Sequence, residues 1–180
     1  MSGSLTALGT ASRTPKRARL VRVLPASADQ VWASWTDPDL LPGWFGPVLS
    51  GVPGPEQKFV LEGRGQHGDT IDCRVLTWEP SSVLEFTWCY IGETADSVIR
   101  LELSPADDGA TRLVLEHTGF GPEADPVDYA AGWHMYTDNL EARLAGTPGV
   151  PDSDARWMEL IPVYADTTEQ ANPAQGETAP

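Results

Sequence analysis

The segment DPVDYAAGWHMYTDNLEARLAG at residues 125–146 decides the fold that we expect. Asp125 is a good helix cap, Pro126 suits the first helical position, and Gly146 suits the position after a helix end. We therefore predict one helix of about twenty residues, roughly 30 Å long. At helical spacing its inward stripe comprises Tyr129, Trp133, Tyr136, Thr137, Leu140 and Leu144.

A run of predicted β-strands precedes this helix. Alternating apolar and polar residues predict strands at 17–25, 58–64, 70–78, 83–90, 97–103 and 111–117, with a weaker one near 48–52. Turn-forming residues between them favour antiparallel hairpins. One face of this sheet is apolar and comprises Leu76, Trp78, Leu84, Phe86, Trp88, Ile99, Leu101, Leu103, Leu113 and Leu115. The long helix is the element that can cover this face.

Two short helices are expected between the first strand and the hairpins. Ser27 and Gln30 are spaced as a capping box, in which each side chain satisfies a free backbone donor. Asp37-Pro38 starts a second short helix, and Gly43 ends it. Trp44 and Phe45 follow as apolar anchors.

Composition limits the possible partners. The chain has 180 residues and a net charge of −14, with 12 Lys and Arg. Such an acidic surface repels phosphate backbones and anionic lipids, so we expect neither nucleic acid nor membrane as a partner. The first residues lack the apolar core of a signal peptide, and a cytoplasmic location is expected.

Three regions are predicted along the chain. Residues 1–16 are small and polar, which favours a disordered N-terminus, and residues 17–147 form one domain. Residues 148–180 contain a linker, a short apolar segment at 155–165 and a tail of disordered composition. The apolar segment could dock on this domain or on a second subunit.

Four phrases of the sequence match a known family in order. VWASWTDPDLLPGWFGP (31–47) resembles a segment of the activator of heat-shock-protein-90 ATPase homologue family, within the START-like (SRPBCC) superfamily. LTWEPSSVLEFTW (76–88), TRLVLEHTGF (111–120) and GWHMYTDNLEARLAG (132–146) resemble its later landmarks. The resemblance covers residues 17–147. It implies an α+β helix-grip fold, in which a curved antiparallel sheet wraps around a long C-terminal helix and two short helices follow the first strand.

The resemblance also implies a cavity between the sheet and the long helix, for a small apolar or polycyclic ligand. Relatives bind lipids, sterols, hormones and polyketides, and some cyclise polyketide chains. Some actinobacterial relatives protect their hosts from enediyne antibiotics by being sacrificed to the drug. Co-chaperone activity does not carry over, because this chain is one such domain without a partner domain.

The strands and the long helix supply the candidate ligand-binding residues. If residues 76 and 86 pair across the turn at 79–82, Arg74 opposes Trp88 and Asp72 opposes Tyr90, and all point inward. Ser97 and His117 would meet nearby, giving a polar rim at the pocket mouth. The alternatives are solvated strand ends and helix aromatics that only fill a core. The candidates are Trp32, Arg74, Trp78, Phe86, Trp88, Tyr90, Leu101, Leu115, His117, Tyr129, Trp133, Tyr136 and Thr137.

A self-sacrifice mechanism would need a glycine near the cavity. The Cα–H bond of glycine is weak because both neighbouring amide groups stabilise the resulting radical. Gly119 and Gly121 lie between the last strand and the long helix, at one end of the expected cavity. The alternative is that both are ordinary turn glycines.

The sequence predicts no metal site and no cofactor. His67, His117 and His134 are spread over a loop, a strand and the helix. We expect His134 and Asp138, one turn apart, to form an exposed pair. The expected register places Cys73 opposite Cys89 on the outer face as two reduced thiols.

No nucleophile motif is present, so binding or sequestration is favoured over turnover. An aromatase or cyclase would instead need Arg74, His117 or Tyr90 to polarise a carbonyl group of a polyketide. A protein-interaction module would use the segment at 155–165. A monomer and a homodimer are both compatible with the sequence.

Overall fold

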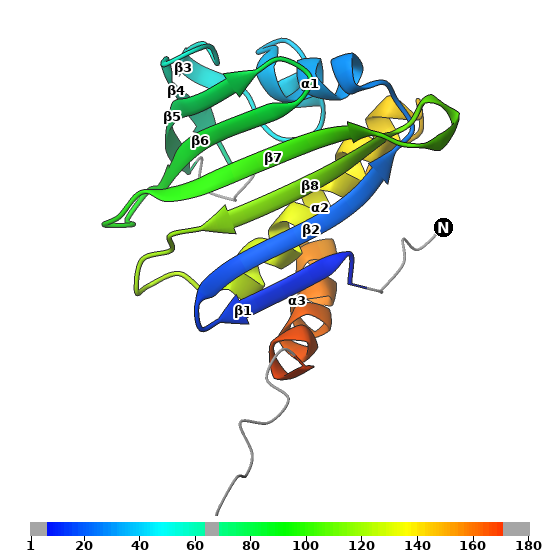
Figure 1. The fold of residues 1–180 in the computed structure, drawn as a ribbon. Coiled ribbons are helices and arrows are strands. Elements are labelled where there is room, and N and C mark those ends of the chain that lie inside the picture. The colour runs from blue at the N-terminus through cyan, green and yellow to red at the C-terminus, as the bar shows by residue number, and fades with distance from the viewer. Residues whose placement is uncertain (1–6, 64–68, 171–180) are drawn as a thin grey trace, which may run out of the picture.

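The computed structural model describes residues 7–63 and 69–170. Within them, eight strands form one antiparallel sheet in the order β1-β2-β8-β7-β6-β5-β4-β3 (Figure 1). The strands are β1 (Gly9–Arg13), β2 (Lys16–Leu24), β3 (Val48–Gly51), β4 (Lys58–Glu62), β5 (Thr70–Glu79), β6 (Val83–Tyr90), β7 (Ser97–Pro105) and β8 (Thr111–Thr118). The helices are α1 (Ala28–Thr36), α2 (Pro126–Leu144) and α3 (Ser153–Gln170), with 3₁₀ turns η1 (Leu41–Gly43) and η2 (Asp107–Gly109).

The long helix α2 lies across one face of the curved sheet, as the helix-grip fold requires (Figure 1). Its predicted ends are confirmed. The Asp125 carboxylate accepts the Val127 N–H at 3.1 Å, and Gly146 has a φ of +68°, which favours glycine. Trp133 and Leu140 on its inward stripe are buried in the core. The predicted α+β helix-grip fold is therefore confirmed.

The segment between β2 and β3 packs under the sheet. The capping box of α1 is present, since Ser27 Oγ accepts the Gln30 N–H and the Gln30 side chain accepts the Ser27 N–H. The second predicted helix is shorter than expected. Asp37 Oδ1 accepts the Asp39 N–H at 2.9 Å, and only the single turn η1 follows.

The predicted disorder of residues 1–16 is wrong for residues 9–13. These form β1, which pairs with β2 from Gly9↔Leu20 to Arg13↔Lys16. The small side chain of Ala11 is fully buried, which places this edge strand against the core. Small residues carry little periodic hydrophobic signal, so the sequence pattern did not reveal the strand.

The segment 155–165 belongs to a regular helix, α3, rather than to a short apolar patch. It lies against α2 and β1 of its own chain (Figure 1). Leu160 and Tyr164 are fully buried, and Arg156 Nε lies 2.9 Å from Asp138 Oδ2 on α2. This helix covers the side of α2 that the sequence placed in water.

The predicted exposed pair of His134 and Asp138 is therefore buried instead. His134 is 2% exposed, its Nδ1 lies 3.1 Å from the Tyr164 hydroxyl, and its Nε2 lies 3.6 Å from Asp138 Oδ1. Burial lowers the pKa of His134 to about 4, with Asp138 opposing the shift and Arg22 and Arg156 adding to it. The imidazole is thus neutral at physiological pH.

A β-bulge in β5 changes the predicted register with β6. The pairs Trp78↔Leu84 and Val75↔Phe86 lie on either side of an irregularity between Val75 and Thr77. One extra residue shifts every side chain before it to the other face. The inward positions are therefore Ile71, Cys73 and Val75, whereas Asp72, Arg74 and Leu76 face solvent.

Two inferences from the predicted register are accordingly wrong. Arg74 does not oppose Trp88, and its backbone N–H bonds the Thr87 hydroxyl at 3.0 Å on the outer face. Cys73 is buried rather than outward, Asp72 pairs with Cys89, and both cysteines are reduced. Burial raises the pKa of the Cys73 thiol, with Asp72 and Cys89 adding to the shift.

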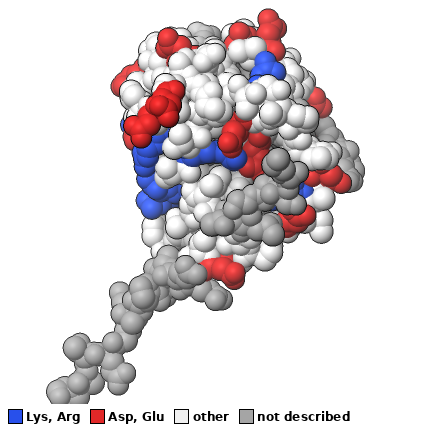
Figure 2. Space-filling model, turned by 90° about the vertical axis from the view of Figure 1, so that its right-hand side faces the viewer, with Lys and Arg blue, Asp and Glu red and all other residues white. Residues whose placement is uncertain are grey.

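The surface reflects the acidic composition. Figure 2 shows one face of the molecule, on which most of the visible basic side chains gather toward one side and acidic ones are more widely spread. Among the described residues, no helix is long and apolar enough to cross a membrane.

Candidate ligand-binding site

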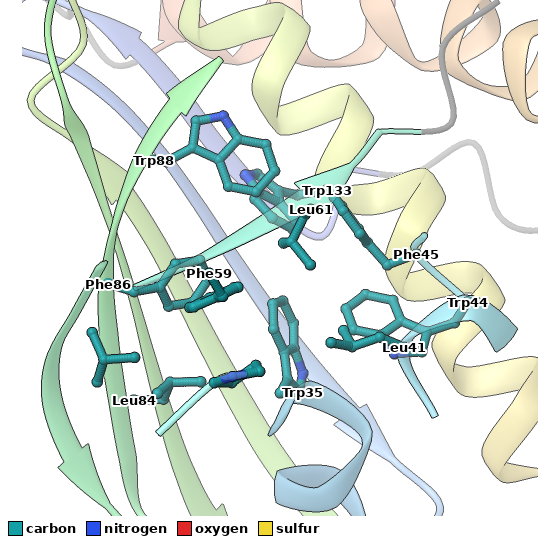
Figure 3. A pocket seen from close by; sticks show the side chains of 12 residues that line it. Trp35, Leu41, Trp44, Phe45, Phe59, Leu61, Leu84, Phe86, Trp88 and Trp133 are labelled. Carbon is teal, nitrogen blue, oxygen red and sulfur yellow. The ribbon is translucent and has the colours of Figure 1, made fainter. Parts of the chain in front are cut away.

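The space between the sheet and α2 is divided into a filled part and an open part. Side chains occupy nearly all of the filled part. The space left there, here called the inner void, measures about 10 Å³, about the least that can hold one water molecule (Figure 3). The open part, here called the outer pocket, measures about 470 Å³ and lies toward the N-terminal half of α2. Phe45, Trp88 and Trp133 contribute to the walls of both.

The inner void is small because Trp35 of α1 and Trp44, which follows η1, insert their side chains beneath the sheet. Trp35 and Trp44 pack edge to face with centroids 4.6 Å apart, and Figure 3 shows both close to the void. Trp44 Nε1 donates to the Ser34 carbonyl at 2.8 Å, which fixes the ring. The aromatic residues of the segment 31–47 therefore fill this part of the space between the sheet and α2.

The outer pocket has aromatic walls and an acidic rim. Its volume falls within the usual range for small-molecule sites. The lining residues are Phe45, Gly63, Ile71, Trp88, Tyr90, Glu93, Glu123, Ala124, Asp125, Asp128, Tyr129, Gly132, Trp133, Met135, Tyr136, Ser153, Asp154 and Trp157. Of the thirteen predicted ligand-binding residues, it brings together Trp88, Tyr90, Tyr129, Trp133 and Tyr136.

Carboxylates accept hydrogen bonds from two of the three tyrosine hydroxyls of the wall. Tyr129 donates to Glu93, and Tyr90 donates to Asp69. Burial, together with these carboxylates, raises the pKa of both phenols above their ordinary value. The hydroxyl groups therefore stay protonated and fix the orientation of the rings.

Helix α3 completes the wall of the outer pocket. Ser153, Asp154 and Trp157 line it from the first turns of α3. Trp157 Nε1 donates to the Asp128 carbonyl of α2 at 3.0 Å, and the ring lies beside Gly132, which has no side chain to obstruct it. The periodic pattern of 155–165 indicated an apolar segment but not its position.

His117 does not lie at the pocket mouth, contrary to the prediction. It is fully buried, and the Trp133 indole N–H donates to its Nδ1 at 3.1 Å. Because that indole can only donate, the ring proton of neutral His117 is on Nε2, which donates to Ser97 Oγ at 2.7 Å. The Ser97 hydroxyl then donates to the Trp88 carbonyl at 2.9 Å.

This chain of hydrogen bonds has a chemical consequence. Burial lowers the pKa of His117 to about 3, so the ring is neutral. Both ring nitrogens are used within the fold, and the protonated one faces the Ser97 oxygen. His117 therefore cannot accept a proton from Ser97, and the two do not form a nucleophile and base.

The remaining predicted residues lie outside the outer pocket. Trp32 and Trp78 pack edge to face, with centroids 5.0 Å apart, and line neither cavity. Leu101 and Leu115 are core residues, and Phe86 lines only the inner void. Arg74 borders a separate hollow on the outer face of the sheet.

Thr137 also points away from the outer pocket. Its hydroxyl donates to carbonyl groups of α2 one turn earlier and accepts from Arg22 Nη1 at 3.0 Å. Its polar atom therefore serves the ion network of Arg22, Asp138 and Arg156 beneath α3. A polar residue on the inward stripe did not by itself indicate a pocket.

Neither glycine predicted for self-sacrifice lines the outer pocket. Gly119 has a φ of +74° and backs onto β7, while the Gly121 carbonyl accepts from Lys16 Nζ at 2.8 Å. Gly121 is, however, only two residues from Glu123, which lines the rim.

Several wall residues were not predicted from the sequence. Phe45 was recognised only as an anchor, and Glu93, Glu123 and Asp128 lie in or beside turns that carry no binding motif. A concentration of acidic residues at 123–128, just before and in the first turn of α2, was the available signal.

No metal site is apparent in the described part of the chain. No group of three or more His, Cys, Asp or Glu side chains there is close enough to hold an ion. His67, one of the three histidines considered above, lies outside the described residues.

Comparisons with known proteins agree with this fold. CalU16 from Micromonospora echinospora is 28% identical with a TM-score of 0.69, over 84% of this chain and 88% of that one. DynU16, a putative protein in the dynemicin biosynthetic locus, is 27% identical with a TM-score of 0.64, over 73% of this chain and 48% of that one. A Bordetella parapertussis protein is 27% identical with a TM-score of 0.64, over 99% and 100%.

No curated protein matches the sequence. A family model for the activator of Hsp90 ATPase homolog 1-like protein matches residues 25–145, well over half of the chain. The family model ends before α3, whereas the match to the Bordetella parapertussis structure covers 99% of this chain. The chain belongs to the family of activator of Hsp90 ATPase homolog 1-like proteins, within the START-like superfamily.

Proposed function

We propose that this protein binds and sequesters a small, largely aromatic molecule in the outer pocket. The observation that carries the proposal is an open pocket of about 470 Å³ whose walls include Trp88, Tyr129, Trp133, Tyr136 and Trp157. Aromatic walls with a few polar groups are typical of sites for polycyclic ligands.

Binding without turnover is the simpler function for this site. The buried pair of Ser97 and His117 has no free proton acceptor, and Arg74, which a cyclase would have needed, lies on the outer face. The segment 155–165 is a poor protein-docking surface, because Leu160 and Tyr164 are already buried against α2 and β1.

The relatives favour a natural product as the ligand. One similar structure is that of a putative protein in the dynemicin biosynthetic locus. A role in self-resistance would then consist of holding such a compound away from its target. Quenching by self-cleavage is a second candidate, favoured by the short distance in sequence between Gly121 and the rim residue Glu123.

The test is a titration of the protein with aromatic polyketides, enediynes and lipids. Tryptophan fluorescence measures binding, and intact mass measures any covalent change in the protein or the ligand. We expect saturable quenching, weakened by Trp157→Ala and unchanged by Trp32→Ala, a matched half-buried tryptophan outside the pocket. Protein fragments that end near Gly119–Gly121 would show that the protein is cleaved, and self-sacrifice would then replace sequestration as the proposed function. A changed ligand mass would indicate an enzyme. Absence of binding to every class would contradict the proposal.

A further inference from the structure

The charge of the outer pocket is one-sided. Five of its lining residues are acidic, namely Glu93, Glu123, Asp125, Asp128 and Asp154, and no Lys, Arg or His is among the described lining residues. Carboxylates gathered around a partly enclosed, low-dielectric space produce a negative potential that attracts cations.

Among the described residues, the basic side chains nearest the rim are Arg13 and Lys16. Arg13 Nη2 lies 2.8 Å from Asp125, while Lys16 Nζ donates to the carbonyl oxygens of Gly121, Pro122 and Ala124 at 2.8–2.9 Å. Among the described residues, the hydrogen bonds to the Glu93 carboxylate come from two neutral donors, Tyr129 O–H and Tyr90 N–H. Neutral donors supply no counter-charge.

Glu123 and Asp128 are in a similar position. Glu123 accepts from the Thr94 hydroxyl at 3.4 Å, and among the described residues no lysine or arginine forms an ion pair with either carboxylate. Burial and the neighbouring Asp125 raise the pKa of Asp128, and the more distant charge of Arg13 opposes the shift only in part.

An independent feature of the wall also points to a ligand. Trp88 is 5% exposed, and its buried indole N–H makes no hydrogen bond of ordinary geometry among the described residues, although it lies near the Tyr129 hydroxyl. Figure 3 shows this nitrogen on the side of the ring that is turned away from Phe86 and the inner void. Since a buried donor without a partner is unfavourable, a ligand acceptor at this point would be stabilising.

A metal ion does not fit these observations. No three metal-binding side chains converge among the described residues, and the aromatic wall offers ring faces rather than ligand oxygens. Aromatic faces beside unneutralised carboxylates suit an organic cation, through cation–π contacts and charge-assisted hydrogen bonds.

We infer that the ligand of the outer pocket is a polycyclic aromatic molecule that carries a protonated amine. Its ring system lies against Trp88, Trp133 and Tyr136, with an acceptor atom facing the Trp88 N–H. Its amine lies at the rim, between Glu93, Glu123 and Asp128. This inference rests on the proposed function and specifies the chemical class of its ligand.

The test compares dyes of similar shape and different charge. The tricyclic probes are 9-aminoacridine, which is cationic at pH 7, and neutral 9-anthracenemethanol, each titrated into the full chain by calorimetry. We expect the cationic dye to bind about tenfold more tightly at low salt, with the difference shrinking as salt is added. The double variant Glu123→Gln with Asp128→Asn should lose about tenfold for the cationic dye only.

Two controls separate local from general effects. Glu79→Gln removes an exposed carboxylate of β5 outside the pocket and should leave both affinities unchanged. Equal affinity of the wild-type protein for the two dyes would overturn the inference and leave the proposed function intact. If Glu79→Gln and the double variant lose equal affinity for the cationic dye, the inference would also be overturned, because the selectivity would then follow from the net charge of the protein. If neither dye binds, both proposals fail.

Discussion

The inner void and the outer pocket lie under the same sheet and against the same helix, yet one is filled and the other is open. The filled half receives Trp35 and Trp44 from the segment between β2 and β3, whereas Phe45 is the one residue of that segment that lines the other half. The open half is instead bordered by α3 and by carboxylates. The aromatic residues of the segment 31–47 thus mainly build the core, and under our proposal the selectivity of the site comes mostly from elements outside that segment.

The largest expected effect is on the filled half. Trp44→Ala removes a fully buried ring and its hydrogen bond to Ser34, so the free energy of unfolding should fall by about 3–5 kcal/mol. Urea denaturation would measure this change. Trp157→Ala, on the rim of the open half, should cost no more than about 1 kcal/mol because its side chain is only half-buried. Equal losses of unfolding free energy in the two variants would contradict the division of the cavity into a filled and an open part.

A smaller effect is expected from acid. Burial lowers the pKa of His117 to about 3 and that of His134 to about 4. In the unfolded chain the imidazole pKa has its ordinary value of about 6.5, so below pH 6.5 the unfolded chain binds more protons than the folded chain. Stability is therefore present above that value and is lost as the pH falls toward 4. Between pH 7 and pH 5 the free energy of unfolding should drop by about 2–4 kcal/mol.

Urea denaturation at several pH values would measure this loss. His134→Gln should reduce its slope by removing one of the two groups. A stability profile that is flat between pH 7 and pH 5 would show that neither imidazole is held neutral in the core.

The next effect concerns the open half. Trp157→Ala removes an aromatic wall that α3 contributes, and should weaken binding of 9-aminoacridine about five- to tenfold, or about 1 kcal/mol. Calorimetry measures the affinity, with Trp32→Ala as the matched control. An unchanged affinity would remove α3 from the site and restrict the pocket to the part matched by the family model.

The smallest effect is expected at Arg74. Because the β5 bulge turns this side chain to solvent on the outer face, Arg74→Ala should leave both stability and dye binding unchanged. Denaturation and dye titration check this outcome. A clear loss of affinity would mean that the inward register expected from the simple hairpin is the correct one.

Regular patterns allowed the fold to be predicted, and irregular features prevented a full prediction of the site. The caps at Asp125 and Gly146 placed α2, and alternation placed the strands of the core. Side-chain alternation cannot report a bulge, so the positions of β5 from Asp72 to Leu76 were assigned to the wrong face.

Long-range contacts explain the remaining differences. His134 was assigned to water because its own helix gives no sign that α3 covers it. His117 was placed at a pocket mouth because its internal partners Ser97 and Trp133 are distant in sequence. The acidic rim combines turns and helix ends that meet only in the folded chain.

The location of the ligand can be read from the indole N–H signals of the seven tryptophans in a ¹H–¹⁵N spectrum recorded during titration with 9-aminoacridine. We predict that the signals of Trp88, Trp133 and Trp157 shift in proportion to occupancy, while those of Trp32, Trp44 and Trp78 stay in place. Shifts confined to Trp35 and Trp44 would mean that a ligand opens the inner void. That result, or shifts only at Trp32 and Trp78, would contradict binding in the outer pocket.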